Sequence, residues 1–157
     1  MFQIGDKVFY PMHGAGIIEA IEEREILGKT QEYCVIHIPM NKMDVMLPLK
    51  TMQKSGVRSI IDVDAMREIL FDLHHVESDC DLPWKERYKA NVEKLKTGRV
   101  EDSAEIVRDL LHRNKEKSLN TSERQMLNQA QRNIISEMIL IKDISETEAA
   151  ELLKKSS

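Results

Sequence analysis

The chain has 157 residues, of which 41% are hydrophobic and 32% charged, and its formal net charge is −4 at pH 7. This length allows one medium domain or two small ones, and the composition is ordinary for a soluble globular protein. No stretch reaches the roughly 18 uncharged apolar residues of a membrane span, and no basic leader followed by an apolar run indicates a secretion signal. Cys34 and Cys80 lie far apart, which predicts a cytoplasmic protein without a disulfide framework.

Short apolar runs separated by turn residues predict β-structure before about residue 60. The expected strands cover residues 7–11, 16–26, 32–38 and 43–49. Gly14 and Gly16 suit a turn or bulge that needs a positive φ, and residues 27–29 suit a hairpin turn. Four or five short strands within residues 1–58 indicate a small, strongly bent, barrel-like sheet.

A helical period replaces this pattern after residue 60. Asp62 or Asp64 can cap a first helix that continues to about Leu73, and residues 74–82 show no period. Gly98 suits the end of a second helix, and capping boxes are expected at residues 120–123 and 145–148. Further helices are expected over residues 83–97, 100–112, about 120–141, and from 145 onwards. The sequence thus predicts an α+β protein with a β-domain at residues 1–58 and a compact helical domain at 59–157.

The sequence lacks the common motifs of catalysis and metal binding. It has no glycine-rich phosphate loop, no G-x-S-x-G elbow, and no H-E-x-x-H or C-x-x-C spacing. His74 and His75 would point in different directions on a helix, so we interpret them as structural or surface residues. Asp62 and Asp64 fit helix capping better than metal binding. We expect neither an enzyme nor a bound cofactor or metal.

Charge is unevenly distributed along the helical half of the chain. Residues 62–81 hold seven acids and one base, a net charge of −6, whereas residues 84–99 hold six bases and two acids, a net charge of +4. Because salt screens charges beyond about 8–10 Å, a local basic block can bind a polyanion even on an acidic chain.

Trp84 is the only tryptophan, and it begins the predicted basic helix directly after Pro83. It lies four residues before Tyr88 and could extend the apolar stripe that Tyr88 forms with Val92 and Leu95, as a partly buried packing residue. A flat indole at a helix tip could instead wedge into a DNA groove or stack on an unpaired base. Spacing alone leaves both interpretations open.

Lys85, Arg87 and Lys89 share the first two turns of this helix with Trp84. There the helix dipole and the free backbone N–H groups add to an anion-binding end. Lysine and arginine at such positions would neutralise phosphates without reading bases. Under the packing interpretation of Trp84, the same three side chains would be an ordinary solvated basic face.

Three runs of the sequence resemble the CarD/CdnL family of bacterial transcription regulators. They are IGDKVFYPMHGAGIIE at residues 4–19, RYKANVEKL at 87–95 and AEIVRDL at 104–110. The first run alone resembles the polymerase-binding module of transcription-repair coupling factors as well, so the specificity lies in the combination. The resemblance covers nearly the whole chain in the right order.

Membership of this family would imply a Tudor-like N-terminal domain that binds the β subunit of bacterial RNA polymerase holoenzyme. The helical domain would then lie near the upstream edge of the transcription bubble. Members that resemble this chain stabilise open promoter complexes, largely without sequence preference, so the protein would associate with the nucleoid through polymerase. Trp84 matches the family's minor-groove wedge, and Lys85, Arg87 and Lys89 match its phosphate-contacting positions.

The resemblance also implies a polymerase-binding surface on the β-domain. Arg24 matches a polymerase-contacting arginine, whereas Met46 falls where better-studied relatives carry a second arginine. Asp44, Val45, Met46 and Leu47 would form an exposed strand that meets the polymerase by edge pairing. The departure at Met46 bears on the strength of polymerase binding.

Two alternatives remain open from the sequence. The chain could be a polymerase-binding adaptor whose helices recruit another protein instead of DNA. A free-standing DNA-binding protein is a second possibility, although the net charge of −4 argues against it. A monomer without membrane association is expected, with its oligomeric state left to experiment.

Overall fold

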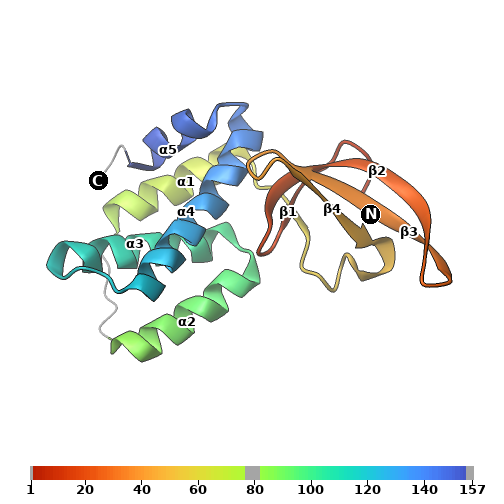
Figure 1. The fold of residues 1–157 in the computed structure, drawn as a ribbon. Helices are drawn as coiled ribbons and strands as arrows, with labels where there is room; N and C mark the ends of the chain where they lie inside the picture. The colour runs from red at the N-terminus through yellow and green to blue at the C-terminus, as the bar shows by residue number, and fades with distance from the viewer. Residues whose placement is uncertain (1, 77–81, 155–157) are drawn as a thin grey trace.

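The fold is known from a computed structural model that describes residues 2–76 and 82–154. Within these residues an antiparallel sheet precedes a group of helices, so the predicted α+β class is confirmed (Figure 1). The strands are β1 (Lys7–Tyr10), β2 (Gly14–Ile26), β3 (Lys29–Ile38), β4 (Met43–Pro48) and β5 (Arg58–Ser59), with a short 3-10 helix at Leu49–Thr51. The helices are α1 (Val63–His75), α2 (Trp84–Thr97), α3 (Val100–Glu116), α4 (Thr121–Lys142) and α5 (Glu146–Lys154).

The sheet has the strand order β4-β3-β2-β1-β5, with every neighbouring pair antiparallel. Its buried face follows the alternation of β3, where Cys34, Ile36 and Ile38 are fully buried and Val35 and His37 point to the other, outer face. A bulge between Ile18 and Ala20 shifts the register of β2 against β3. This open, bent sheet is consistent with the Tudor-like β-domain that the sequence predicts.

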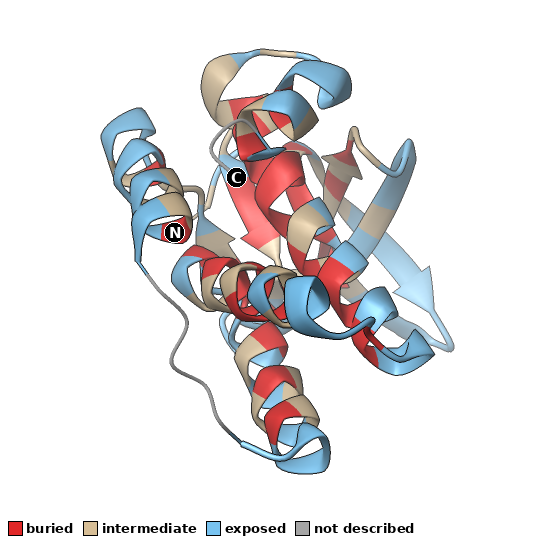
Figure 2. Ribbon diagram, turned by 90° about the vertical axis from the view of Figure 1, so that its left-hand side faces the viewer, coloured by how far each residue is buried: buried red, intermediate tan, exposed pale blue. Residues whose placement is uncertain are grey.

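The helices enclose a second core that is centred on α4. Ile106 and Leu110 of α3 and Ile134 and Met138 of α4 are almost completely buried in it. The stripe predicted on α2 packs against this core from the side. In Figure 2 the buried residues run through the middle of the molecule, and exposed residues cover its outside. None of the described helices is long and apolar enough to cross a membrane.

The helix ends largely follow the sequence signals. Asp62 caps α1 by accepting a hydrogen bond of 2.8 Å from the backbone N–H of Ala65. Gly98 ends α2 in the left-handed conformation, with φ +71°. At the start of α5, Ser145 and Glu148 form the reciprocal bonds of the predicted capping box. Local capping chemistry therefore places these boundaries.

The β-sheet packs against α4, so that the two halves share a continuous interface. Phe9 and Ala15 form a small apolar cluster with Leu140 of α4. Around this cluster, the backbone N–H of Ala15 donates to Ser136 Oγ at 3.2 Å, and Lys7 Nζ donates to the carbonyl of Leu140 at 3.0 Å. The domain boundary predicted between residues 58 and 59 falls inside β5 and stays a prediction.

Candidate functional site

The start of α2 presents Trp84 at the surface of the helical domain. Pro83 precedes it with a φ of −55°, which suits the residue before a helix. Trp84 is 45% exposed, and its indole meets the ring of Tyr88 in a T-shaped contact with centroids 6.3 Å apart. Trp84 therefore packs on Tyr88 and is also partly open to solvent. The packing interpretation and the DNA-contact interpretation each describe part of this arrangement.

Lys85 and Lys89 are exposed on the first turns of α2. They are four residues apart and so lie on one side of the helix, next to the free backbone N–H groups of its first turn. Lys85 directly follows Trp84 in the chain, and Lys89 lies one turn further along the helix. A flat aromatic face and two cations thus meet at one helix end.

Arg87 does not lie with these lysines. Residues two positions apart are about 200° apart around a helix axis, so Arg87 faces inward and is only 4% exposed. Its guanidinium binds the carboxylate of Glu123 through two bonds, Nε to Oε2 at 2.8 Å and Nη2 to Oε1 at 2.9 Å. It also donates to the backbone carbonyl of Leu82 at 3.0 Å. A phosphate contact by Arg87 stays a prediction, and in this structure its charge is engaged inside the protein.

Glu123 also departs from the capping box predicted at residues 120–123. Asn120 does cap α4, because its side chain accepts the backbone N–H of Glu123 at 2.8 Å. The Glu123 carboxylate, however, binds Arg87 and is itself buried. The pair therefore joins the first turn of α2 to the first turn of α4. This long-range partner competes with the local one that the sequence motif suggests.

A hollow of about 310 Å³ lies between Trp84 and the turn from α3 to α4. Arg113 and Lys117 line it from α3 and the turn, with the Arg87–Glu123 pair at its side. Sequence reasoning missed these two bases, which come about 30 residues after Trp84 and reach it only through the helix packing. The local surplus of positive charge at Trp84 is therefore larger than α2 alone provides.

The predicted polymerase-binding residues lie at one side of the sheet. β4 is its outermost strand next to β3. Asp44 and Met46 are exposed on the outer face, where Met46 is paired in register with Val35. Arg24, on the same face of β2, is held in a surface ion pair with Glu22 at 2.8 Å.

Val45 and Leu47 require a correction. Leu47 is only 6% exposed, and Val45 is partly buried against the same β-domain core, so both side chains point away from the outer face of β4. The strand alternates, with Asp44 and Met46 outward and Val45 and Leu47 inward. Leu47 can contribute to edge pairing through its backbone only, and Val45 keeps part of its side chain exposed. The alternation of side chains along a strand predicts this inward direction once Asp44 and Met46 are placed on the outer face.

The outer face also gathers three potential metal ligands that the sequence did not suggest. Glu19, His37 and Asp44 bring one ligand atom each within 4.8 Å of one another. His37 Nδ1 is already hydrogen-bonded to Asp44 Oδ1 at 2.7 Å, and the carboxylates are exposed. This cluster alone does not make a metal site, and it is best described as a polar patch beside β4.

Comparison with known proteins matches both halves of the chain. Residues 68–154 match the family model of the CarD C-terminal domain, and residues 2–61 match that of the CarD-like/TRCF RID domain. A putative transcription factor of Bacillus subtilis, YdeB, is 51% identical over 146 residues, which cover 93% of this chain and 95% of that protein. The NMR structure of the 72-residue N-terminal domain of Myxococcus xanthus CarD is 27% identical, with a TM-score of 0.33, over 38% of this chain and 79% of that domain.

Proposed function

This chain belongs to the CarD family of transcription factors, and on that premise we propose that it binds both RNA polymerase and promoter DNA. The β-sheet would bind the polymerase β subunit, and the start of α2 would contact DNA at the upstream edge of the bubble. The result would be a longer-lived open complex. Transcription regulation is the class of function that the family establishes, and the division of labour between the two surfaces is our proposal.

The observation that carries the proposal is the position of Trp84. The residue is 45% exposed at the first position of α2, while its indole contacts the ring of Tyr88. An aromatic face held this way loses little side-chain freedom on binding. Stacking of a base on such a face contributes roughly 1–3 kcal/mol, and it favours distorted or melted DNA, where bases are already unstacked.

The charges around Trp84 support DNA as its partner. Lys85 and Lys89 on α2 and Arg113 and Lys117 across the hollow provide cations on two sides of the indole. Such contacts neutralise phosphates without sequence preference and weaken with added salt. We do not include Arg87 among the DNA contacts, because its guanidinium is bound to Glu123.

The outer face and free edge of β4 support a protein partner for the sheet. An outermost strand offers backbone N–H and C=O groups that a strand of another protein can pair with. Asp44 and Met46 on β4 and Arg24 on β2 share the outer face and would provide the side-chain contacts. Tethering through this surface would raise the effective DNA concentration at Trp84, so a modest intrinsic DNA affinity would suffice.

Open-complex lifetime, measured with purified holoenzyme, tests the proposal. We expect Trp84→Ala to shorten the lifetime several-fold while the variant still binds polymerase. Phe71→Ala is the matched control, because Phe71 is an exposed aromatic residue of α1, 58% exposed, away from α2. An unchanged lifetime with Trp84→Ala would contradict the DNA part of the proposal.

The adaptor alternative gives a different result in the same assay. If helices α2 to α4 bound a protein instead of DNA, Trp84→Ala and Lys89→Glu would both leave the lifetime unchanged. Under our proposal Lys89→Glu weakens DNA contact, and the loss grows smaller as salt rises, because the phosphate contact is already screened. A loss independent of salt would point to misfolding.

A further inference from the structure

The interface between sheet and helices contains a buried ion pair that neither the family resemblance nor the proposed function uses. Arg58 of β5 binds Glu137 of α4 through two parallel bonds, Nη2 to Oε1 at 2.7 Å and Nη1 to Oε2 at 2.9 Å. Glu137 is completely buried. The backbone N–H of Ile61 donates a third bond to Oε2 at 2.9 Å, so both carboxylate oxygens are satisfied.

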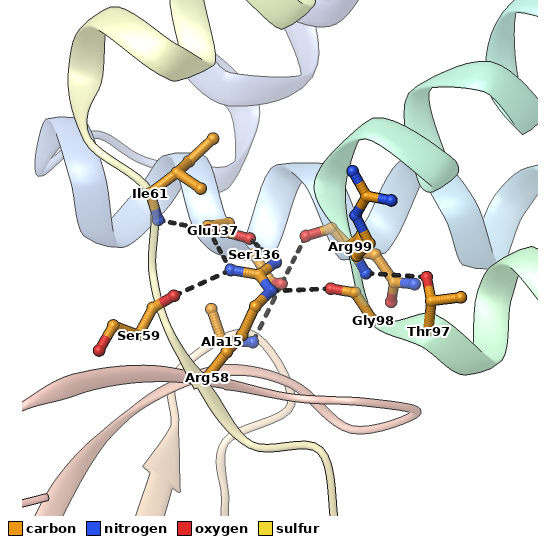
Figure 3. Close-up of polar contacts among 10 residues, drawn as sticks. Ala15, Arg58, Ser59, Ile61, Thr97, Gly98, Arg99, Ser136 and Glu137 are labelled. Carbon is orange, nitrogen blue, oxygen red and sulfur yellow. Dashed lines mark hydrogen bonds and ion pairs between the residues drawn. The ribbon is translucent and has the colours of Figure 1, made fainter. Parts of the chain in front are cut away.

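Arg58 reaches a third element beyond the sheet and α4. Its Nε donates to the backbone carbonyl of Gly98 at 2.9 Å, at the end of α2 (Figure 3). Its guanidinium also lies over the ring of Phe9 at 4.7 Å. One side chain of the β-domain therefore joins β1, α4 and the end of α2. We call Arg58, Glu137 and the Gly98 carbonyl the clasp.

The end of α2 fits tightly against the β-domain at this point. A Cβ atom added to Gly98 would lie 2.7 Å from Cγ of Pro11, so the backbone of Gly98 is in close contact with the proline ring. Among the described residues, the other polar contacts between the two halves bind α4: Ala15 to Ser136, Lys7 to the Leu140 carbonyl, and Asn41 to Arg132. The clasp is thus the polar contact that links the sheet to α2 itself.

The clasp acts at one end of α2 and Trp84 lies at the other. In Figure 1, α2 runs from its start, far from the sheet, towards the sheet. The helix has 14 residues, so its ends are about 20 Å apart at 1.5 Å per residue. Because Arg87–Glu123 fixes α2 to α4, α2 would move together with the helical domain. A rotation of this domain by about 10° about Gly98 would move Trp84 by about 3.5 Å over this length. Such a shift is enough to take an aromatic ring out of a stacking contact.

We propose that Arg58 and Glu137 are positioning residues that fix the direction of α2 relative to the β-domain. The inference rests on the proposed function, since it assumes that the sheet is anchored on polymerase while Trp84 meets DNA. Buried ion pairs often stabilise a fold no better than apolar side chains of the same size. A bidentate pair does fix one geometry, because the guanidinium fork and the carboxylate match in one plane.

Distance measurements between the two halves test the clasp directly. Spin labels at Lys54→Cys, in the exposed turn before β5, and Lys96→Cys, on the exposed side of α2, report on the direction of α2. Cys80→Ser removes one natural thiol, and Cys34 is kept because it is fully buried. We expect a narrow distance distribution for the otherwise unchanged chain and a clearly broader one with Glu137→Gln. An unchanged width would overturn the proposal.

The functional test compares Glu137→Gln with a control of equal stability. We expect Glu137→Gln to shorten the open-complex lifetime at least threefold while polymerase affinity stays within twofold. Val107→Ala, in the helical core away from the interface, is the control. Each variant is measured at the same number of degrees below its own melting point. An equal loss of lifetime in this control would overturn the proposal. If Glu137→Gln does not fold, Arg58→Lys, which keeps the charge without the fork, takes its place in both tests.

A cross-link separates positioning from any other effect of the substitution. Arg132 Nη2 of α4 donates to Asn41 Oδ1 at 2.8 Å, at the surface of the interface. Cysteines at these positions, joined by a short bifunctional reagent, should restore most of the open-complex lifetime that Glu137→Gln loses. If the cross-link restores none of it, the result counts against the clasp. If Trp84→Ala leaves the lifetime unchanged, the proposed function fails instead. The distance distributions then decide the clasp alone.

Discussion

Two buried arginine–glutamate pairs among the described residues hold the two ends of α2. Arg87 and Glu123 lie at its start and are each about 4% exposed in their side chains. Arg58 and Glu137 lie at its end, where the arginine side chain is 24% exposed and the glutamate fully buried. Both pairs are bidentate, and in both the glutamate comes from α4.

The pairs differ in what they join. Arg87–Glu123 connects two helices of the same domain and fixes the tip that carries Trp84. Arg58–Glu137 connects the β-domain to α4 and, through the Gly98 carbonyl, to α2. The first pair therefore bears on the stability and local shape of the site. The second bears on where the site lies relative to the sheet.

The largest effect we expect comes from Arg87→Met. It leaves Glu123 buried without its charge partner, which typically lowers the free energy of unfolding by about 3–5 kcal/mol. The double variant Arg87→Met/Glu123→Leu should recover most of this, because an apolar pair of similar volume replaces both charges. Urea denaturation followed by circular dichroism measures both variants.

The folded double variant also decides the role of Arg87. If Arg87 has only a structural role, DNA binding by the double variant in the polymerase complex should keep the salt dependence of the unaltered protein. If Arg87 contacts DNA, as the resemblance implies, the slope of log affinity against log salt concentration should fall by the amount of about one phosphate contact. Lys89→Met is the matched comparison, since we expect that variant to lose such a contact without losing stability.

Gly98→Ala should have the next largest effect, at the other end of α2. Alanine is strained at φ +71°, which costs about 1–2 kcal/mol, and its Cβ would meet the Pro11 ring at 2.7 Å. Overpacking of this kind adds about 1–3 kcal/mol. Gly28→Ala is the control, because Gly28 has φ +79° and no atom lies within 4 Å of the place that an alanine Cβ would occupy. Equal losses in thermal denaturation would mean that the contact with Pro11 is unimportant.

The sequence predicted the elements because their signals are local. Pro83, Gly98 and Asp62 act within one helical turn, and the structure places all three where the sequence does. The pairs could not be predicted in this way. Arg58 and Glu137 are 79 residues apart, and no periodicity links them. Only the packing of α4 against the sheet brings them together.

The site was predicted in part for the same reason. Trp84, Lys85 and Lys89 follow from a helix start with a basic run, and they are exposed as expected. Arg87 belongs to the same run, and its inward direction follows from its place four and eight residues before the buried Asn91 and Leu95. Its partner, Glu123 of α4, does not, because the sequence indicated Glu123 as a capping residue. The inward direction of Leu47 was within reach, because strand alternation predicts it once Asp44 and Met46 point outward.

Met46→Arg extends the comparison to the polymerase-binding face, with a smaller expected effect. Met46 is 39% exposed on the outer face, so the free energy of unfolding should change by no more than about 0.5 kcal/mol. Polymerase affinity should rise about threefold to tenfold, which corresponds to roughly 0.7–1.4 kcal/mol. Met43→Arg controls for added charge, because Met43 is 45% exposed on the same strand but pairs with the buried Ile38. Equal gains in both variants would indicate nonspecific attraction.

The smallest effect concerns a buried polar group that, unlike the two pairs, has no partner among the described residues. His74 Nε2 is buried near the end of α1 without a hydrogen bond there. Burial lowers the pKa of His74 below its ordinary value of 6.5, and the neighbouring His75 lowers it further. The unfolded chain therefore takes up this proton first, and stability falls as pH drops through about 6.5 towards the lower folded pKa.

We expect His74→Gln to flatten the decline in unfolding free energy between about pH 7.5 and 5.5. The control is His112→Gln, at an exposed position of α3, which should leave the slope of unfolding free energy against pH unchanged. If both variants decline as steeply as the unaltered protein, His74 is not what makes the fold sensitive to acid.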